Sequence, residues 1–98
     1  MKFILNFTPT AKEAQRQLKQ NSFLSKRYKA VVKALKFLQE NPKHQSLQTH
    51  QYYSLKGPKA EKIFEAYAEQ NTPAAYRIFF YYGPRKREIT VFAITPHP

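Results

Sequence analysis

Apolar and polar residues alternate in three short runs near the end of the chain. Residues 62–68, 76–82 and 88–95 place apolar side chains at every second position and are rich in β-branched and aromatic residues. A period of two with this composition predicts three strands. The segments between them, residues 70–73 and 83–86, contain asparagine, proline and glycine, which favour turns. The sequence therefore predicts an antiparallel meander.

The beginning of the chain shows the patterns of a strand and a helix. Residues 2–7 alternate and are few, which predicts a short strand at or near a sheet edge. Thr10 and Glu13 have the spacing of a capping box, in which hydroxyl and carboxylate satisfy each other's free amides. This spacing predicts a helix that begins there and ends near Gln20.

A longer amphipathic segment follows. Residues 24–40 repeat apolar side chains at helical spacing, which predicts a second helix with a stripe wide enough to cover a sheet. Asn41 and Pro42 end it, because a residue that precedes proline avoids the helical region. Residues 42–58 are polar and irregular, so they are expected to form a loop longer than typical connections.

The predicted order of elements is β-α-α-β-β-β. It indicates an α+β fold in a single domain, residues 1–98, with a helical pair packed on one face of a twisted, mainly antiparallel sheet. Nothing in the sequence covers the opposite face, which is free to take a ligand or a partner. In the last strand, the alternation predicts one face of Ile89, Val91 and Ala93 and an opposite face of Thr90, Phe92 and Ile94.

The net charge of the chain indicates which classes of partner it attracts. It has 17 Lys and Arg against 6 acidic residues, a net charge of +11. Such a protein is attracted to polyanions, of which nucleic acid is the usual one, and an acidic protein partner would exploit the same field. Four lysines, Lys26, Lys29, Lys33 and Lys36, repeat along one face of the second predicted helix. A solvated face and a nucleic-acid footprint are both open interpretations of that row.

Composition also excludes several classes of function. There is no cysteine, so disulfides, thiolate chemistry and thiolate metal sites are excluded. His44 and His50 match no metal-binding spacing, and no metal or other cofactor is expected. The chain lacks a run long enough to span a bilayer and lacks a secretory signal, so we expect a cytoplasmic protein without membrane contact.

Arg77 is the first candidate for chemistry because it interrupts the middle strand. It has no acidic neighbour in sequence. A buried guanidinium without a partner is very costly, so Arg77 must reach solvent, a carboxylate such as Glu65, or a bound anion. The strand alternation places Glu65, Tyr67, Arg77 and Tyr81 on one face of the sheet if their strands pair in register.

The order of elements, the Leu55-Lys56-Gly57 segment and Tyr76-Arg77 in the middle strand together resemble the RelE/ParE superfamily of small bacterial toxins. For the RelE-like branch, the resemblance implies a ribosome-dependent mRNA endoribonuclease that an antitoxin silences. For the ParE-like branch, it implies a gyrase poison without nuclease activity. Fold does not separate the two, so the site residues have to decide. We favour the first, because the basic charge, Arg77 and His97 agree with it, although Tyr67 counts against it.

The resemblance also implies roles for individual residues. Arg77 falls on the arginine that holds the scissile phosphate, and His97 falls near a C-terminal acid or base of nuclease members. Tyr67 stands where many members carry a basic residue, so the presumed site lacks one cation. Lys56 matches the lysine of the Leu-Lys-Gly turn, with a structural or an RNA-backbone role.

A metal-free ribonuclease needs a base for the 2′-hydroxyl, cations for the phosphorane and an acid for the leaving 5′-oxygen. Arg77 and His97, with Glu65 or Tyr67 for the other proton transfer, are the predicted catalytic set. Contacts to RNA are expected from Lys56, Tyr81, Lys29, Lys33 and Lys36. The expected partners are the ribosome, mRNA and an acidic cognate antitoxin, in a possible toxin–antitoxin hetero-oligomer.

Two other interpretations stay open at this point. Glu65 and Arg77 are also consistent with a plain cross-strand ion pair, which contributes little when exposed. The chain is also consistent with a gyrase inhibitor, or with an inactive relative that binds only RNA or antitoxin. Replacement of Arg77 and His97 separates the cases, because a nuclease loses toxicity while a pure binder keeps it.

Overall fold

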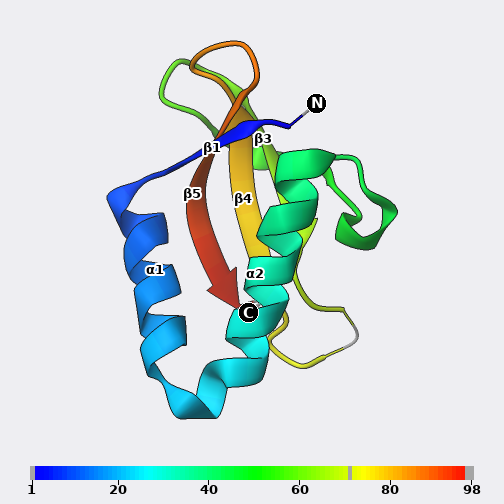
Figure 1. Ribbon diagram of the computed structural model, residues 1–98. Coiled ribbons are helices and arrows are strands. Elements are labelled where there is room, and N and C mark those ends of the chain that lie inside the picture. The colour runs from blue at the N-terminus through cyan, green and yellow to red at the C-terminus, as the bar shows by residue number, and fades with distance from the viewer. Residues whose placement is uncertain (1, 71, 97–98) are drawn as a thin grey trace.

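The computed structural model describes residues 2–70 and 72–96, and within them the chain forms five strands and two α-helices in an α+β arrangement (Figure 1). The strands are β1 (Ile4–Phe7), β2 (His50–Lys56), β3 (Lys62–Tyr67), β4 (Tyr76–Tyr82) and β5 (Glu88–Pro96). The helices are α1 (Pro9–Gln20) and α2 (Ser25–Glu40), with short 3₁₀ turns at Ser22–Leu24 and Gln45–Leu47. The predicted fold class is confirmed.

The sheet has the order β1-β5-β4-β3-β2. The predicted meander is confirmed, because β3, β4 and β5 pair antiparallel, and β2 extends it on the side of β3. β1 lies at the other edge and pairs parallel to β5, with Leu5 opposite Ile89 and Phe7 opposite Val91. Both helices lie on the same face of the sheet (Figure 1).

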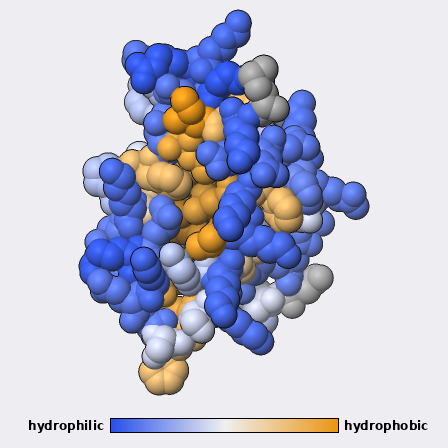
Figure 2. Space-filling view, in the orientation of Figure 1, coloured by the Kyte–Doolittle hydropathy of each residue, from blue (hydrophilic) through white to orange (hydrophobic). Residues whose placement is uncertain are grey.

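The core lies between the helices and that face. Its fully buried side chains include Leu38 from α2, Ile78 and Phe80 from β4, and Ile89 and Val91 from β5. The space-filling view shows this apolar layer as a strip between the two helices, bordered by hydrophilic side chains (Figure 2). The alternation of β3 and β4 therefore sends Phe64, Ala66, Ile78 and Phe80 inward and Glu65, Arg77 and Phe79 to the opposite face.

The prediction of a loop over residues 42–58 was wrong for its second half, where β2 forms. β2 pairs His50 with Glu65 and Tyr52 with Ile63, then shifts register before Lys56. A strand at a sheet edge can be polar on both faces, so it need not alternate apolar and polar residues. The register shift also interrupts the two-residue repeat of side-chain directions along β2. For both reasons the strand pattern is absent from the sequence.

The start of α1 also differs from the prediction. The N-cap is Thr8, whose Oγ1 accepts a hydrogen bond from the amide of Ala11, and Pro9 occupies the first helical position. Proline is suited to that position because its missing N–H would have no partner there. Glu13 does not complete a capping box and instead forms an ion pair with Arg16.

The predicted faces of the last strand need a correction after Val91. The register of β4 with β5 shifts, so that Phe80 pairs with Val91 and Phe79 with Ala93. Phe92 is the extra residue of this bulge, and a bulge reverses the alternation beyond it. Ile94 therefore joins the core beside Ile78, while Ala93 turns to the opposite face.

The end of the second helix agrees with the prediction from the sequence. α2 ends at Glu40 before Asn41-Pro42, as predicted. In the described residues, no helix combines the length and the apolar character needed to cross a membrane.

Candidate functional site

A buried ion pair between Glu65 and Arg77 is the centre of the face opposite the helices. β3 and β4 pair Tyr67 with Arg77 and Glu65 with Phe79, so Glu65 and Arg77 are diagonal neighbours. Nη1 of Arg77 donates to Oε2 of Glu65. The carboxylate side chain is 4% exposed and the guanidinium side chain 12%. The sequence left solvent, a carboxylate or a bound anion as the partner of Arg77, and in the structure the partner is the carboxylate of Glu65.

Two further features of Arg77 bear on what it can bind. Its guanidinium carbon lies 4.9 Å from the centre of the Phe79 ring, a cation–π geometry. Its Nε is buried and has no hydrogen-bond partner among the described residues. A buried donor that is left unpaired is costly and calls for an explanation.

His50 joins the pair from the edge strand. Its Nε2 lies 2.7 Å from Oε1 of Glu65, so the carboxylate contacts one basic side chain with each oxygen. The imidazole is 47% exposed and lies against the ring of Tyr67, with 5.7 Å between ring centres. We call His50, Glu65, Tyr67 and Arg77 the ionic cluster.

Aromatic side chains continue the same face beside the ionic cluster. Tyr52 packs edge-on against Phe79 with ring centres 5.0 Å apart, and Phe92 lies 6.2 Å from Phe79. Tyr81 lies next to Phe92 at 6.3 Å. The prediction that Glu65, Tyr67, Arg77 and Tyr81 share a face is therefore confirmed. Planar rings beside a cation form a surface on which unpaired bases stack.

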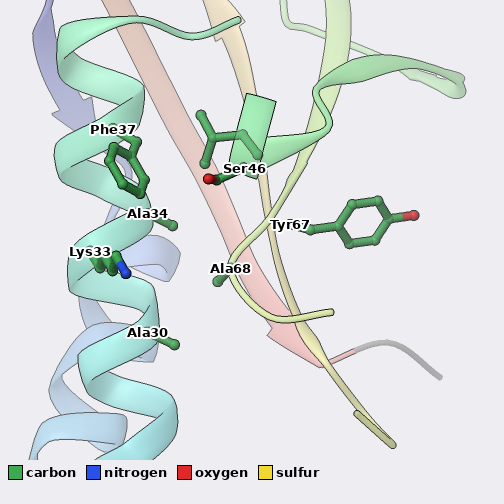
Figure 3. A pocket seen from close by; sticks show the side chains of 8 residues that line it. Ala30, Lys33, Ala34, Phe37, Ser46, Tyr67 and Ala68 are labelled. Atoms are coloured by element: carbon green, nitrogen blue, oxygen red, sulfur yellow. The ribbon is translucent and has the colours of Figure 1, made fainter. Parts of the chain in front are cut away.

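The lysines predicted to contact RNA lie elsewhere. Lys29, Lys33 and Lys36 are exposed on α2, in the layer on the other side of the sheet. Lys33 and Tyr67 nevertheless line one pocket of about 230 Å³ between α2 and β3. In Figure 3 the ring of Tyr67 points away from α2, while Lys33 lies on the opposite wall. This pocket therefore has one lysine of the row on one wall and one residue of the ionic cluster on the other.

Lys56 is exposed at the end of β2, where its partner in the sheet is Lys62. The residue after it, Gly57, lies where a larger side chain would be too close to its neighbours. A Cβ on Gly57 would lie 2.5 Å from Oε1 of Glu61, and that oxygen accepts from the amide of Lys59. The Leu55-Lys56-Gly57 segment thus makes a close turn between β2 and β3 and leaves the lysine in solvent.

A second charged group lies at the start of β5. Glu88 is buried and accepts hydrogen bonds from Nε of Arg85 at 2.9 Å and from Nδ2 of Asn6 at 3.1 Å. The Arg85 hydrogen bond, followed by that of Asn6, holds the pKa of Glu88 below its ordinary value. The carboxylate thereby joins β1 to β5 and has a structural role.

Sequence reasoning missed one member of the ionic cluster and named one residue that the structure does not describe. His50 was expected in a loop, and only the register of β2 with β3 brings it to Glu65. No local signal in the sequence carries that register. His97 lies outside the described residues. Among the residues that are described, no three side chains of metal-binding type gather as a metal site requires.

The order of the strands and the helical pair on one face of the sheet give a fold that is shared with a RelE chain of known structure. The structure is similar to the RelE chain in the crystal structure of the archaeal RelE–RelB complex from Pyrococcus horikoshii OT3, with a TM-score of 0.66. The likeness covers 98% of this chain and 96% of that one, at 13% sequence identity. No protein-family model and no curated protein matches the chain. The similarity therefore establishes the fold.

Proposed function

We propose that the chain is the toxin of a type II toxin–antitoxin system and that it cleaves mRNA on the ribosome without a metal. The observation that carries this proposal is the ionic cluster, an arginine paired with a carboxylate on the uncovered face of a RelE-like sheet. Cleavage would proceed by attack of the 2′-hydroxyl on the adjacent phosphate. In this chemistry the positive charge of Arg77 stabilises the charge that develops on the phosphate oxygens.

The cluster supplies the other groups that this reaction needs. Glu65 contacts both Arg77 and His50, and His50 also lies against Tyr67; an imidazole is the most usual proton carrier in catalysis. A phosphate that approached Arg77 would compete with Glu65 for the guanidinium. His97 stays a predicted acid or base outside the described residues.

The charge of the protein supports an RNA substrate. A net charge of +11 attracts a phosphate backbone, and Lys29, Lys33 and Lys36 extend the positive surface beyond the cluster. Tyr52, Tyr81 and Phe92 on the same face are partly exposed and suit the stacking of unpaired bases. Together they favour a single-stranded RNA as the substrate.

The same charge supports an acidic antitoxin as partner. The similar archaeal structure is a complex of RelE with RelB. An acidic segment that orders on this basic surface would neutralise it and block the approach of RNA. The expected assembly is a toxin–antitoxin hetero-oligomer.

One observation favours a second function, a ParE-like gyrase inhibitor or a relative that binds without catalysis. Glu65 already neutralises Arg77, and Tyr67 occupies a position where a cation would strengthen phosphate binding. A binding surface does not require Arg77 to exchange Glu65 for a phosphate, whereas the proposed ribonuclease does.

The test is mRNA cleavage on programmed ribosomes. We expect cuts at the decoding site with the wild-type protein, loss of cutting with Arg77→Ala and His97→Ala, and resistance of a message with a 2′-deoxy nucleotide at the cut. The matched control is Arg85→Ala, because Arg85 also pairs with a glutamate of the sheet but is 81% exposed and lies outside the cluster. Folded wild-type protein that cuts no message but blocks gyrase supercoiling would move the function to the second class.

A further inference from the structure

His50 is the accessible member of the ionic cluster. Its side chain is 47% exposed, while those of Glu65 and Arg77 are 4% and 12% exposed. Both carboxylate oxygens of Glu65 are engaged, Oε1 by His50 and Oε2 by Arg77. A substrate that approaches this face meets the imidazole before it meets the carboxylate. Glu65 is therefore poorly placed to exchange protons with RNA.

The two ring nitrogens of His50 both face acceptors. Nδ1 lies 2.9 Å from the main-chain carbonyl oxygen of Gln48, which can only accept. Nε2 lies 2.7 Å from the carboxylate of Glu65. The doubly protonated imidazolium satisfies both contacts, because it carries an N–H on each nitrogen. Glu65 holds the ring by Nε2 and leaves the Nδ1 proton on the exposed side of the contact, against a carbonyl that a substrate oxygen can replace.

We propose that His50 is the general acid of the site and that Glu65 is a positioning residue that orients it. This inference rests on the proposed function, ribonuclease cleavage at Arg77. It gives the cluster a division of labour in which Arg77 binds the phosphate, His50 donates a proton and Glu65 holds both cations in register. A carboxylate that orients an imidazole through one nitrogen, so that the other can work, is a recurring catalytic arrangement.

Cleavage forms one bond to phosphorus and breaks another. The 2′-oxygen forms a bond to phosphorus and its proton passes to water. The bond between phosphorus and the 5′-oxygen breaks, its electron pair stays on that oxygen, and the 5′-oxygen takes the Nδ1 proton of His50. The products are a 2′,3′-cyclic phosphate and a 5′-hydroxyl, and the imidazole regains a proton from water.

The experiment compares two leaving groups at the mapped cut of an mRNA on programmed ribosomes. One message has the natural 5′-oxygen, and the other has a bridging 5′-sulfur, which leaves without protonation. On the natural message we expect His50→Gln to lose about 10²- to 10⁴-fold in cleavage rate, the range that general acids contribute. On the sulfur message its rate should return close to that of the wild type. Glu65→Gln should recover in part, because it also disturbs Arg77.

Two controls accompany this comparison. His44→Gln makes the same change at a histidine that stacks on Phe37 and lies outside the cluster, and it should cleave both messages as the wild type does. Arg77→Ala should stay impaired on both, because sulfur does not replace phosphate binding. A thermal unfolding curve for each variant separates loss of fold from loss of chemistry.

The possible failures are distinct. If the wild type cleaves and His50→Gln cleaves the natural message equally well, His50 is not the acid and the proposed function stands. A His50→Gln defect of the same size on the sulfur message would assign a structural role to the histidine and also overturn the inference. Wild-type protein that cleaves neither message would overturn the ribonuclease function and the inference together.

Discussion

Removal of Arg77 alone should destabilise the fold as well as the chemistry. In Arg77→Met, Glu65 stays buried beside β4 with His50 as its remaining partner. Breaking a buried ion pair by removing one partner costs about 3–5 kcal/mol, and we take about 3 because the imidazole still contacts the carboxylate. Since a domain of this size has a free energy of unfolding of about 5–15 kcal/mol, the loss is a large part of the total.

The assay is urea unfolding followed by far-ultraviolet circular dichroism. With a slope of about 1 kcal/mol per M, the midpoint should fall by about 3 M. The melting temperature should fall by about 12–24 °C, at about 4–8 °C for each kcal/mol. Glu65→Met should cost a similar amount, because it leaves the guanidinium buried without its carboxylate. The double variant, Glu65→Met with Arg77→Met, should be no less stable than either single variant, since two apolar side chains can pack together without burying an unpaired charge.

This pattern amounts to a coupling free energy of about 3 kcal/mol between the two positions, at the upper end of measured pairs. Single variants that each cost less than about 1 kcal/mol, with additive effects in the double variant, would refute the reasoning, because exposed ion pairs behave in that way. The result also sets the conditions for cleavage assays, in which Arg77 variants have to be compared at a temperature where both proteins are folded.

Three further outcomes are expected. Thr8→Ala should lower the free energy of unfolding by about 1 kcal/mol in thermal or urea unfolding, while Thr10→Ala should change it little, because Thr8 is the cap of α1. Because the folded-state pKa of Glu88 is lowered from 4.5, its stabilising contribution is present above that value and is lost as the pH falls through the lower one. The difference in free energy of unfolding between wild type and Glu88→Gln should therefore shrink on acidification. The third outcome concerns the lysines of α2, Lys29, Lys33 and Lys36, replaced together by glutamine. In filter binding to single-stranded RNA, the slope of log affinity against log salt concentration should become less steep by about 2, since each phosphate contact contributes about 0.7.

The parts of the fold that the sequence predicted are those with local periodicity. The alternation in β3 and β4 places Glu65 and Arg77 on the same face, and the antiparallel register brings them into contact. The helical spacing and the Asn41-Pro42 stop likewise predict α2. The alternation within each strand and the end of the helix depend on neighbours within a few positions.

The parts that were missed depend on distant partners or on choices between similar local signals. β2 is a strand because β3 offers it a ladder, and His50 enters the cluster through that pairing alone. The bulge at Phe92 comes from the fit of β5 to β4, so the reversal at Ile94 has no counterpart in the pattern of the strand itself. Thr8 and Thr10 compete for the same cap, and Pro9 is the signal that favours Thr8.

The parallel pairing of β1 with β5 has a consequence for the order in which the chain assembles. The side chains of Asn6 and Glu88, which bond across this seam, are 82 positions apart. Closing a loop of that length costs about 4 kcal/mol in chain entropy by the logarithmic law, before any contact offsets it. Contacts of such separation form late in folding, and β1 cannot obtain its neighbour until residues 88–96 have been synthesised. The meander of β2 to β5 can form first, and the N-terminal strand then completes the sheet.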